Sequence, residues 1–188
     1  ALVDRMLEAH QGLAETYGTS FRFQHPPGSF TVEADVRRIE QVLGNLLANA
    51  CKFSNRDSVV EVSLGSERAF ARVSVTNHGP MIPDDFRPRI FSKFAQADAS
   101  SSRPAGGTGL GLAISKALVE AHGGRIGFES RPEATTFWFD LPSGEGLTTQ
   151  LSASPSRYWE LEAKAERPGV DYLATFLLPI YERPGAAG

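Results

Sequence analysis

Closely spaced glycines between positions 106 and 111 constrain the fold of this chain more than any other feature. Four of these six positions are glycine, and apolar residues at helical spacing follow from Leu110 onward, so the cluster stands where a loop becomes a helix. Glycine lacks the Cβ atom that keeps a ligand away from the backbone, and it permits positive φ in a tight turn. The first turn of a helix adds unpaired N–H groups and the positive end of the helix dipole. The cluster therefore predicts an anion site, and a nucleotide is the first hypothesis.

The spacing of these glycines matches neither of the two common phosphate-binding motifs. It is not the dinucleotide fingerprint, and the lysine followed by serine or threonine that completes a P-loop is missing. Taken alone, the cluster is equally consistent with a flexible surface turn. A second group of residues, on a predicted helix upstream, favours the nucleotide.

The strongest helical pattern runs from Val36 to Phe53, with Asp35 in a suitable position for an N-cap. One side of this helix is apolar and carries Val36, Ile39, Leu43, Leu46, Leu47 and Ala50. The other side carries a narrow band of Gln41, Asn45, Asn49 and Lys52. Asparagine is a poor helix former that gains nothing from exposure to water. We therefore interpret the band as side chains held for a ligand; the alternative is a polar surface that happens to use amides.

The other elements follow from hydrophobic periodicity and turn residues. We predict a helix over residues 2–17 and a hairpin of residues 21–25 and 30–33, divided by Pro26, Pro27 and Gly28. Two further hairpins pair residues 59–64 with 70–76 and residues 125–130 with 135–141. A further helix starts near Leu110, ends at residues 122–124, and presents a face of Leu110, Ile114, Ala117 and Ala121. Residues 97–105 are small and polar, which is typical of a mobile loop. This order predicts an α+β domain with its helices on one face of a sheet.

Composition excludes several classes of partner. The 188-residue chain has a net charge of −3 and no visible basic patch, so we expect no nucleic acid and no direct membrane contact. Its single cysteine, Cys51, rules out an internal disulfide and favours a reducing compartment. No apolar run reaches the length of a membrane span and no signal-peptide pattern opens the chain, so we expect a cytoplasmic location. Because the chain begins at Ala1 rather than Met, we expect it to be part of a longer protein.

We expect two regions along the chain. Residues 1–142 contain the elements described above and form the main domain. Glycine, serine and threonine then dominate up to residue 156, and aromatic and apolar residues follow between prolines. We expect residues 143–188 to be a C-terminal extension of unknown role that packs against the main domain, with one more strand over residues 173–178.

The chain from residue 2 to residue 142 resembles the ATP-binding catalytic domain of bacterial sensor histidine kinases, in the superfamily that includes gyrase, Hsp90 and MutL. Four motifs occur in the family's order: residues 41–54 are similar to its N box, 77–82 to its G1 box, 90–94 with Gln96 to its F box, and 107–112 to its G2 box. The resemblance implies a two-layer α/β sandwich of the Bergerat type. Such a fold has a mixed sheet with helices on one face and a mobile ATP lid, here including residues 100–105.

The resemblance also implies roles for single residues. It implies ATP and Mg²⁺ as cofactors, with Asn49 as the metal ligand through its side-chain oxygen and Lys52 neutralising phosphate charge. Asn45 stands where ATP-hydrolysing relatives have a glutamate that serves as general base, and an amide cannot take that proton. We therefore expect phosphoryl transfer to a partner side chain, with Asn45, Asn49 and Lys52 as the catalytic group. The other residues implied to contact the nucleotide are Asn77, Gly79, Ile82, Phe94, Gly107, Thr108, Gly109, Leu110, Gly111 and Leu112.

The G1 box departs from the family pattern at two positions. Asn77 replaces an aspartate that accepts a hydrogen bond from the exocyclic amine of adenine, and Met81 replaces the second glycine. A neutral amide oxygen still accepts, but it contributes about 1 kcal/mol where a charged acceptor contributes about 2 kcal/mol. Met81 does not adopt positive φ cheaply, so we expect this turn to differ from the family form.

These motifs lead us to expect the catalytic half of a two-component sensor histidine kinase. It would transfer the γ-phosphate of ATP to a histidine on a separate dimerisation and phosphoacceptor hairpin, N-terminal to Ala1. None of the chain's own histidines is followed by the acidic residue and proline of the family's acceptor site. The implied partners are that hairpin, a response regulator or receiver domain, and a second copy of the full-length protein.

Two alternatives to this function stay open. A degenerate, non-catalytic signalling module is favoured by Asn77 and Met81. An anti-sigma-type serine kinase belongs to the same superfamily and lacks the hairpin, but the F box and the length of the lid argue against it.

Overall fold

The computed structural model describes residues 2–24, 32–67, 69–96, 108–143, 157–167 and 170–180. The chain divides into two compact units, Ala1–Thr149 and Gln150–Gly188. The first unit contains a five-stranded sheet together with the helices of the described residues, and the second contains a two-stranded sheet. The border at Thr149 falls inside the extension that we expected to begin at residue 143.

The sheet of the first unit is mixed, as predicted. Its strand order is β1-β2-β3-β5-β4. The strands are β1 (Thr19–Gln24), β2 (Ser58–Glu67), β3 (Phe70–Asn77), β4 (Arg125–Ser130) and β5 (Thr135–Pro142). β1 runs parallel to β2, and the other neighbouring pairs are antiparallel. The β2–β3 and β4–β5 hairpins confirm two of the predicted pairings.

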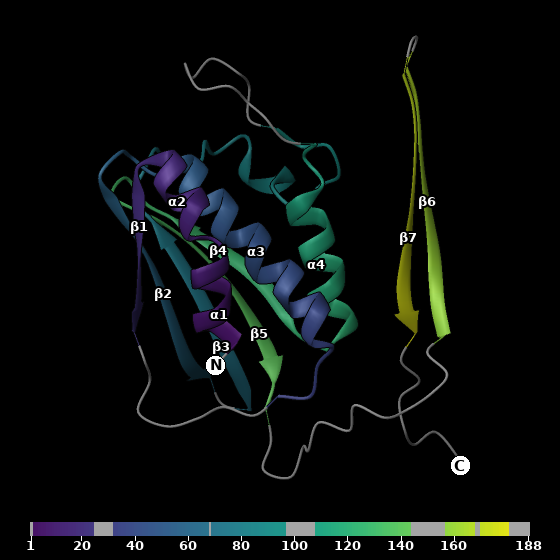
Figure 1. The fold of residues 1–188 in the computed structure, drawn as a ribbon, viewed down its shortest axis with the longest axis horizontal. Coiled ribbons are helices and arrows are strands. Elements are labelled where there is room, and N and C mark those ends of the chain that lie inside the picture. The colour runs from purple at the N-terminus through teal and green to yellow at the C-terminus, as the bar shows by residue number, and fades with distance from the viewer. Residues whose placement is uncertain are drawn as a thin grey trace. The chain divides into compact units, whose positions relative to one another are not determined.

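The helices cover one face of this sheet. They are α1 (Leu2–Ala9), α2 (Gln11–Tyr17), α3 (Val36–Phe53), α4 (Gly111–Ala121) and the short 3₁₀ helix η1 (Arg87–Arg89). Figure 1 shows α1 to α4 on the same side of the strands, which confirms the two-layer arrangement. α3 begins where predicted because the Asp35 carboxylate accepts hydrogen bonds from the backbone N–H groups of Arg37 (2.9 Å) and Arg38 (3.3 Å). The core between the layers includes Leu43, Leu46, Leu47, Val60, Val62, Val75, Val119 and Phe139.

The predicted hairpin of residues 21–25 and 30–33 is wrong. β1 pairs with β2, from Thr19 opposite Ser58 to Gln24 opposite Ser63, and α3 lies between the two strands in the chain. A parallel pair needs such a crossover connection, whereas the prolines after residue 25 had indicated a tight turn. Val32 forms an isolated bridge with Ser143 instead, and residues 25–31 lie outside the described residues.

The helix predicted over residues 2–17 is two helices, with the break at His10. The backbone of His10 leaves the helical region (φ −102°, ψ 5°), and its carbonyl oxygen starts the hydrogen bonds of α2. Its ring lies against α3, because a Cβ built on Gly44 would stand 3.2 Å from His10 Nε2. The contact with α3 thus overrides the local helical pattern.

The buried faces of two helices also differ from prediction. In α3 the predicted apolar residues are buried except Val36, which is 38% exposed in the first turn. In α4 the predicted face is wrong, because Ala117 and Ala121 are exposed while Ser115, Leu118 and Val119 are buried. Small alanines left the apolar stripe of α4 ambiguous, and the larger Leu118 and Val119 turn toward the sheet.

A buried carboxylate lies on the side of the sheet opposite the helices. Asp140 of β5 alternates with core residues, so its side chain points away from the helices, yet it is 0% exposed. Arg72 of β3 binds it through Nε to Oδ1 (2.6 Å) and Nη2 to Oδ2 (2.9 Å), and Arg125 of β4 binds Oδ2 through Nη2 (3.0 Å). The guanidinium of Arg72 also lies 4.2 Å from the ring centroid of Trp138. This cluster therefore joins three neighbouring strands outside the main core.

The second unit is an antiparallel pair of strands, β6 (Arg157–Arg167) and β7 (Val170–Ile180), with Arg167 opposite Val170. β7 contains residues 173–178, where a strand was predicted, whereas β6 was not predicted. Packing of this region on the main domain stays an expectation. Among the helices of the described residues, none combines the length and the apolar character needed to cross a bilayer.

Candidate nucleotide-binding site

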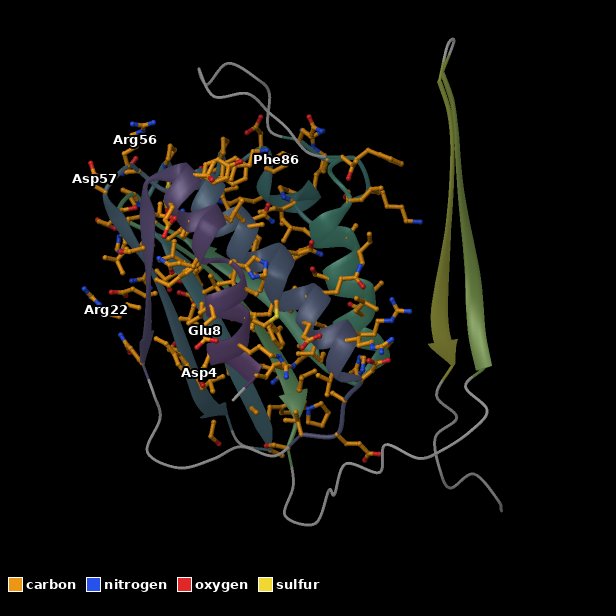
Figure 2. The ribbon with its side chains drawn as sticks, viewed as in Figure 1. Asp4, Glu8, Arg22, Arg56, Asp57 and Phe86 are labelled. Carbon is orange, nitrogen blue, oxygen red and sulfur yellow. The ribbon has the colours of Figure 1, made fainter. Side chains whose placement is uncertain are left out.

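The sequence motifs gather at one end of the first unit. α3 ends there, α4 begins there and β3 ends there (Figure 1). Figure 2 shows Phe86, directly before η1, and Arg56 and Asp57, directly after α3, at the same end. Residues that are far apart in the chain therefore meet around the C-terminal end of α3.

Asn45 joins the N box to the G2 box. Its amide nitrogen donates to the Gly111 carbonyl oxygen and to the Ser115 hydroxyl, both at 3.2 Å, across 66 and 70 residues of sequence. Ser115 is fully buried. Sequence analysis did not select it, because a serine one turn after Gly111, in a helix that also carries Lys116 and Glu120, has no distinctive sequence signal. The amide-bearing side of α3 is thus fixed against the first turn of α4.

Asn49 and Lys52 follow Asn45 on the same side of α3. Both are half-buried. No hydrogen bond joins the Asn49 side chain to any described residue, so its amide oxygen is available to a ligand. The ammonium of Lys52 lies 5.2 Å from the ring centroid of Phe53. These positions agree with the predicted band and leave an oxygen donor and a positive charge one turn apart.

Asn77 is the last residue of β3 and is 4% exposed. Within the described part of the chain, its side chain makes no hydrogen bond. A buried amide gains free energy from any partner that satisfies it. Asn77 is therefore the second polar side chain, after Asn49, that is placed to receive a ligand.

Gly79 is required by a close approach of two backbones. A Cβ on this residue would stand 1.9 Å from the Phe53 carbonyl oxygen, at the end of α3. Neither Gly79 nor Met81 has positive φ, so this turn avoids the conformation that Met81 resists. Met81 is 41% exposed.

Ile82 is half-buried, and its backbone is held by residues that sequence analysis did not select. Its N–H donates to the Ser130 hydroxyl at the end of β4 (2.9 Å), and its carbonyl oxygen accepts from Arg87 Nε (3.3 Å). A serine at a strand end and an arginine in a short helix carry no distinctive sequence signal. Their contribution is visible only in the tertiary structure.

The F box and the G2 box touch through their backbones. Phe94 N–H donates to the Gly109 carbonyl oxygen (3.0 Å), and both residues have positive φ, 61° and 69°. A Cβ on Gly109 would lie 2.8 Å from the Phe94 carbonyl carbon, so only glycine fits. The Phe94 ring is 65% exposed, whereas Phe91 packs edge-on against Phe128 and Phe137.

The remaining G2 residues surround the start of α4. Thr108 is exposed, Leu110, Gly111 and Leu112 are half-buried, and α4 begins at Gly111 with Leu110 as its N-cap. Leu110 makes no side-chain capping bond, so the first N–H groups of α4 are left for another partner. Gly107 and the predicted lid, residues 100–105, lie outside the described residues.

The donor set at this end suits a nucleotide with a hard cation. In the described part of the chain, no group of three or more His, Cys, Asp or Glu side chains is placed to hold a metal ion. A cation here would therefore take its other ligands from phosphate and water, which is how Mg²⁺ usually binds in nucleotide sites. An amide oxygen on Asn49 fits that chemistry.

Cys51 lies between these residues in sequence but takes no part in the site. It is fully buried in α3. Burial raises the pKa of its thiol, and a hydrogen bond with the Thr19 side chain opposes this only in part. The thiol is therefore protonated near neutral pH and is not a nucleophile.

Comparison with known proteins gives consistent matches. The model of the histidine kinase-, DNA gyrase B-, and HSP90-like ATPase family matches residues 34–145. The sensor histidine kinase AruS of Pseudomonas aeruginosa is 53% identical over 110 residues, which are 55% of this chain and 11% of AruS. The structure of full-length ShkA in complex with AMPPNP has a TM-score of 0.67 and 30% identity, over 77% of this chain and 30% of ShkA.

A further solved structure includes a partner protein. Histidine kinase ThkA in complex with the response regulator protein TrrA has a TM-score of 0.63 and 30% identity, over 76% of this chain and 40% of ThkA. The present chain is much shorter than the curated relatives that it matches, since it spans only 11% of AruS.

Proposed function

Because the chain belongs to the histidine kinase-, DNA gyrase B-, and HSP90-like ATPase family, we propose that it transfers the γ-phosphate of ATP to a histidine on a partner. The chain is a catalytic domain of the sensor histidine kinase type. The observation that carries the proposal is the pair of hydrogen bonds from Asn45 to Gly111 and Ser115. They hold the amides of α3 beside the N-terminus of α4, where unpaired N–H groups favour phosphate.

Asn45 supports transfer to a protein side chain over transfer to water. A general base must accept a proton from the attacking group. The Asn45 amide has no basic lone pair for that purpose, and its nitrogen already donates to α4. Hydrolysis is therefore slow in this domain, and the acceptor histidine supplies the nucleophile.

Asn49 and Lys52 would hold the phosphate end of Mg-ATP. Mg²⁺ is bound by one or two protein oxygens together with phosphate and water, and Asn49 offers one such oxygen. When bound, the ion would neutralise negative charge that develops during phosphoryl transfer. Lys52 adds positive charge from the same face of α3, and Thr108, Gly109, Leu110, Gly111 and Leu112 would surround the phosphates with backbone N–H groups. The same role is proposed for Gly107 from the motif alone, since it lies outside the described residues.

The base end of the nucleotide would lie against the G1 box. Asn77 offers a buried amide to the edge of the purine, and Gly79 lets the segment after β3 lie directly against the Phe53 carbonyl oxygen at the end of α3. Ile82 presents apolar surface to the ring, and Phe94 closes the site near the G2 box. In this arrangement ATP spans the gap between the end of β3 and the start of α4.

The proposed partners follow from the relatives. A response regulator or receiver domain would receive the phosphate, as the ThkA complex with TrrA suggests for this family. The phosphoacceptor hairpin and a second copy of the full-length protein complete the assembly. We also propose a cytoplasmic location, since ATP and such partners are found there.

The degenerate, non-catalytic module remains the second candidate because Asn77 and Met81 depart from the motif. It predicts folding without nucleotide binding. The anti-sigma-type serine kinase has less support, since the F-box residue Phe91 is packed into the sheet by two aromatic contacts.

Phosphoryl transfer in trans tests this proposal. The chain is incubated with γ-labelled Mg-ATP and a phosphoacceptor hairpin, with the hairpin's histidine replaced by glutamine as control. We expect acid-labile phosphate on the unmodified hairpin and none on the control or on the chain alone. Acid-labile label on the isolated chain would contradict the proposal and would direct attention to His10.

A further inference from the structure

The wall of the site between Asn77 and Pro83 is held without regular secondary structure. In the described part of the chain, residues 79–82 make no hydrogen bond to another backbone group. Pro80 and Pro83 have no N–H group to donate. The near end of the segment is fixed by the His78 carbonyl oxygen, which accepts a hydrogen bond from the Asn55 N–H group (2.7 Å). At the far end, the Pro83 carbonyl oxygen accepts from the N–H groups of Phe86 (3.0 Å) and Arg87 (3.1 Å). The backbone groups of Ile82 find their partners elsewhere.

Two side chains satisfy both backbone groups of Ile82. Ser130 Oγ accepts from the Ile82 N–H group at 2.9 Å, and Arg87 Nε donates to the Ile82 carbonyl oxygen at 3.3 Å. Arg87 Nη2 also donates to the Ser130 carbonyl oxygen at 3.0 Å. One guanidinium therefore holds Ile82 and the end of β4 together.

The two side chains that bind Ile82 are connected to the sheet through Ser130. Ser130 Oγ lies 2.8 Å from Thr135 Oγ1, and Thr135 is 3% exposed at the start of β5. Thr135 is also the residue directly opposite Asn77 in the β3–β5 ladder. Asn77 is therefore held opposite Thr135 at the start of β5, and Ile82 is held by Ser130 at the end of β4. Because Ser130 and Thr135 are bonded to each other, the sheet sets the distance between Asn77 and Ile82.

We propose that Ser130 and Arg87 are positioning residues for the nucleoside half of the ligand. They act through Ile82, whose backbone they bind, and they keep the segment that carries Gly79 at a fixed distance from Asn77. Met81 stands where a glycine would give a tighter turn, so this segment depends on external bonds for its shape. The inference rests on the proposed nucleotide site and adds the residues that set its affinity for the base.

Two probes separate this role from a general structural one. Mg-ATP contacts both ends of the site, whereas Mg-tripolyphosphate contacts only the phosphate end. We expect Ser130→Ala and Arg87→Met to weaken Mg-ATP about five- to tenfold, the effect of the one hydrogen bond that each side chain makes to Ile82, with unchanged affinity for Mg-tripolyphosphate. Arg87→Met also removes the bond to the Ser130 carbonyl oxygen and the pair with Asp84. Ser130→Thr keeps the hydroxyl and restores ATP affinity. Arg89→Met, a neighbour in η1 that makes no bond to Ile82, is the matched control.

The binding constants are measured by calorimetry after thermal unfolding has shown that each variant is folded. Wild-type affinity for Mg-ATP in both Ser130→Ala and Arg87→Met would overturn this inference and leave the proposed function intact. An equal loss of affinity for ATP and tripolyphosphate would also overturn it, because the role would then be structural. If the wild-type chain binds neither probe, the proposed function fails first and the inference fails with it.

Discussion

The amide nitrogen of Asn45 on α3 lies 3.2 Å from the hydroxyl oxygen of Ser115 on α4, and it donates to the Gly111 carbonyl oxygen at the same distance. The two helices that carry the N box and the G2 box are therefore joined by one side chain. Both bonds are made within the chain itself, so the phosphate end of the proposed site is preformed. A preformed site loses less entropy when it binds.

This relation predicts a measurable coupling between two residues. Ser115→Ala should lower the free energy of unfolding by about 1 kcal/mol, because a buried hydrogen bond is lost. In a double-mutant cycle with Asn45→Ala, we expect a coupling of about 0.5–1.5 kcal/mol. Glu120→Ala, on the exposed side of α4, serves as the control. Denaturant unfolding measures all of them, and strictly additive effects would refute the coupling.

Gly79 offers a test of the contact between the G1 box and α3. A Cβ at this position would stand 1.9 Å from the Phe53 carbonyl oxygen, so Gly79→Ala should displace the segment and abolish Mg-ATP binding. Gly12→Ala is the matched control, since nothing lies within 4 Å of its added Cβ. That change in α2 should raise stability by about 0.5–1 kcal/mol. Normal nucleotide binding by Gly79→Ala would show that the backbones are not this close in solution.

The sequence patterns predicted those parts of the fold that depend on residues close together in the chain. The Asp35 cap and the apolar side of α3 fixed that helix, and alternation fixed the β2–β3 and β4–β5 hairpins. The partner of β1 was not predictable in this way, because parallel pairing depends on a strand beyond α3. The break at His10 likewise follows from a contact with α3 that the sequence of residues 2–17 does not contain.

The site residues also fall into those that the sequence could identify and those that it could not. Asn45, Asn49 and the glycines stood out as unusual residue types for their predicted positions. Ser115, Ser130 and Arg87 did not, since serine and arginine are ordinary at such positions and gain their roles from residues far away in the chain. The reason for Gly79 was also hidden, because its constraint comes from the Phe53 carbonyl group rather than from its own turn.

The cluster around Asp140 predicts a strong dependence of stability on one carboxylate. Asp140→Ala removes three charge-assisted hydrogen bonds from Arg72 and Arg125, whose side chains are 29% and 57% exposed, and we expect a loss of about 1.5–3 kcal/mol. Asp84→Ala is the control, because its pair with Arg87 (3.0 Å) involves a side chain that is 85% exposed, so the change should stay within about 0.5 kcal/mol. Urea unfolding measures both. Similar small losses in the two variants would show that the cluster contributes little.

With Asn77 in place of an aspartate, we expect the domain to discriminate less strongly between ATP and GTP. An amide offers its oxygen to the amine of adenine or, after a flip, its NH₂ group to the carbonyl oxygen of guanine. Asn77→Asp should therefore tighten ATP binding roughly fivefold and weaken GTP binding. Asn55→Asp, an exposed position after α3, controls for the added charge. If Asn77→Asp leaves ATP affinity as it was and the wild type already rejects GTP, Asn77 does not face the base.

Calorimetric titration of Mg-ATP into the wild type and into Asn49→Ala tests the central claim most directly. The control is Asn55→Ala, which removes an exposed amide just beyond α3 and keeps the backbone bond to His78. The account predicts Mg²⁺-dependent ATP binding in the wild type and in Asn55→Ala, and its loss in a folded Asn49→Ala. Unchanged Mg-ATP affinity in Asn49→Ala would contradict the assignment of the metal and phosphate site to α3.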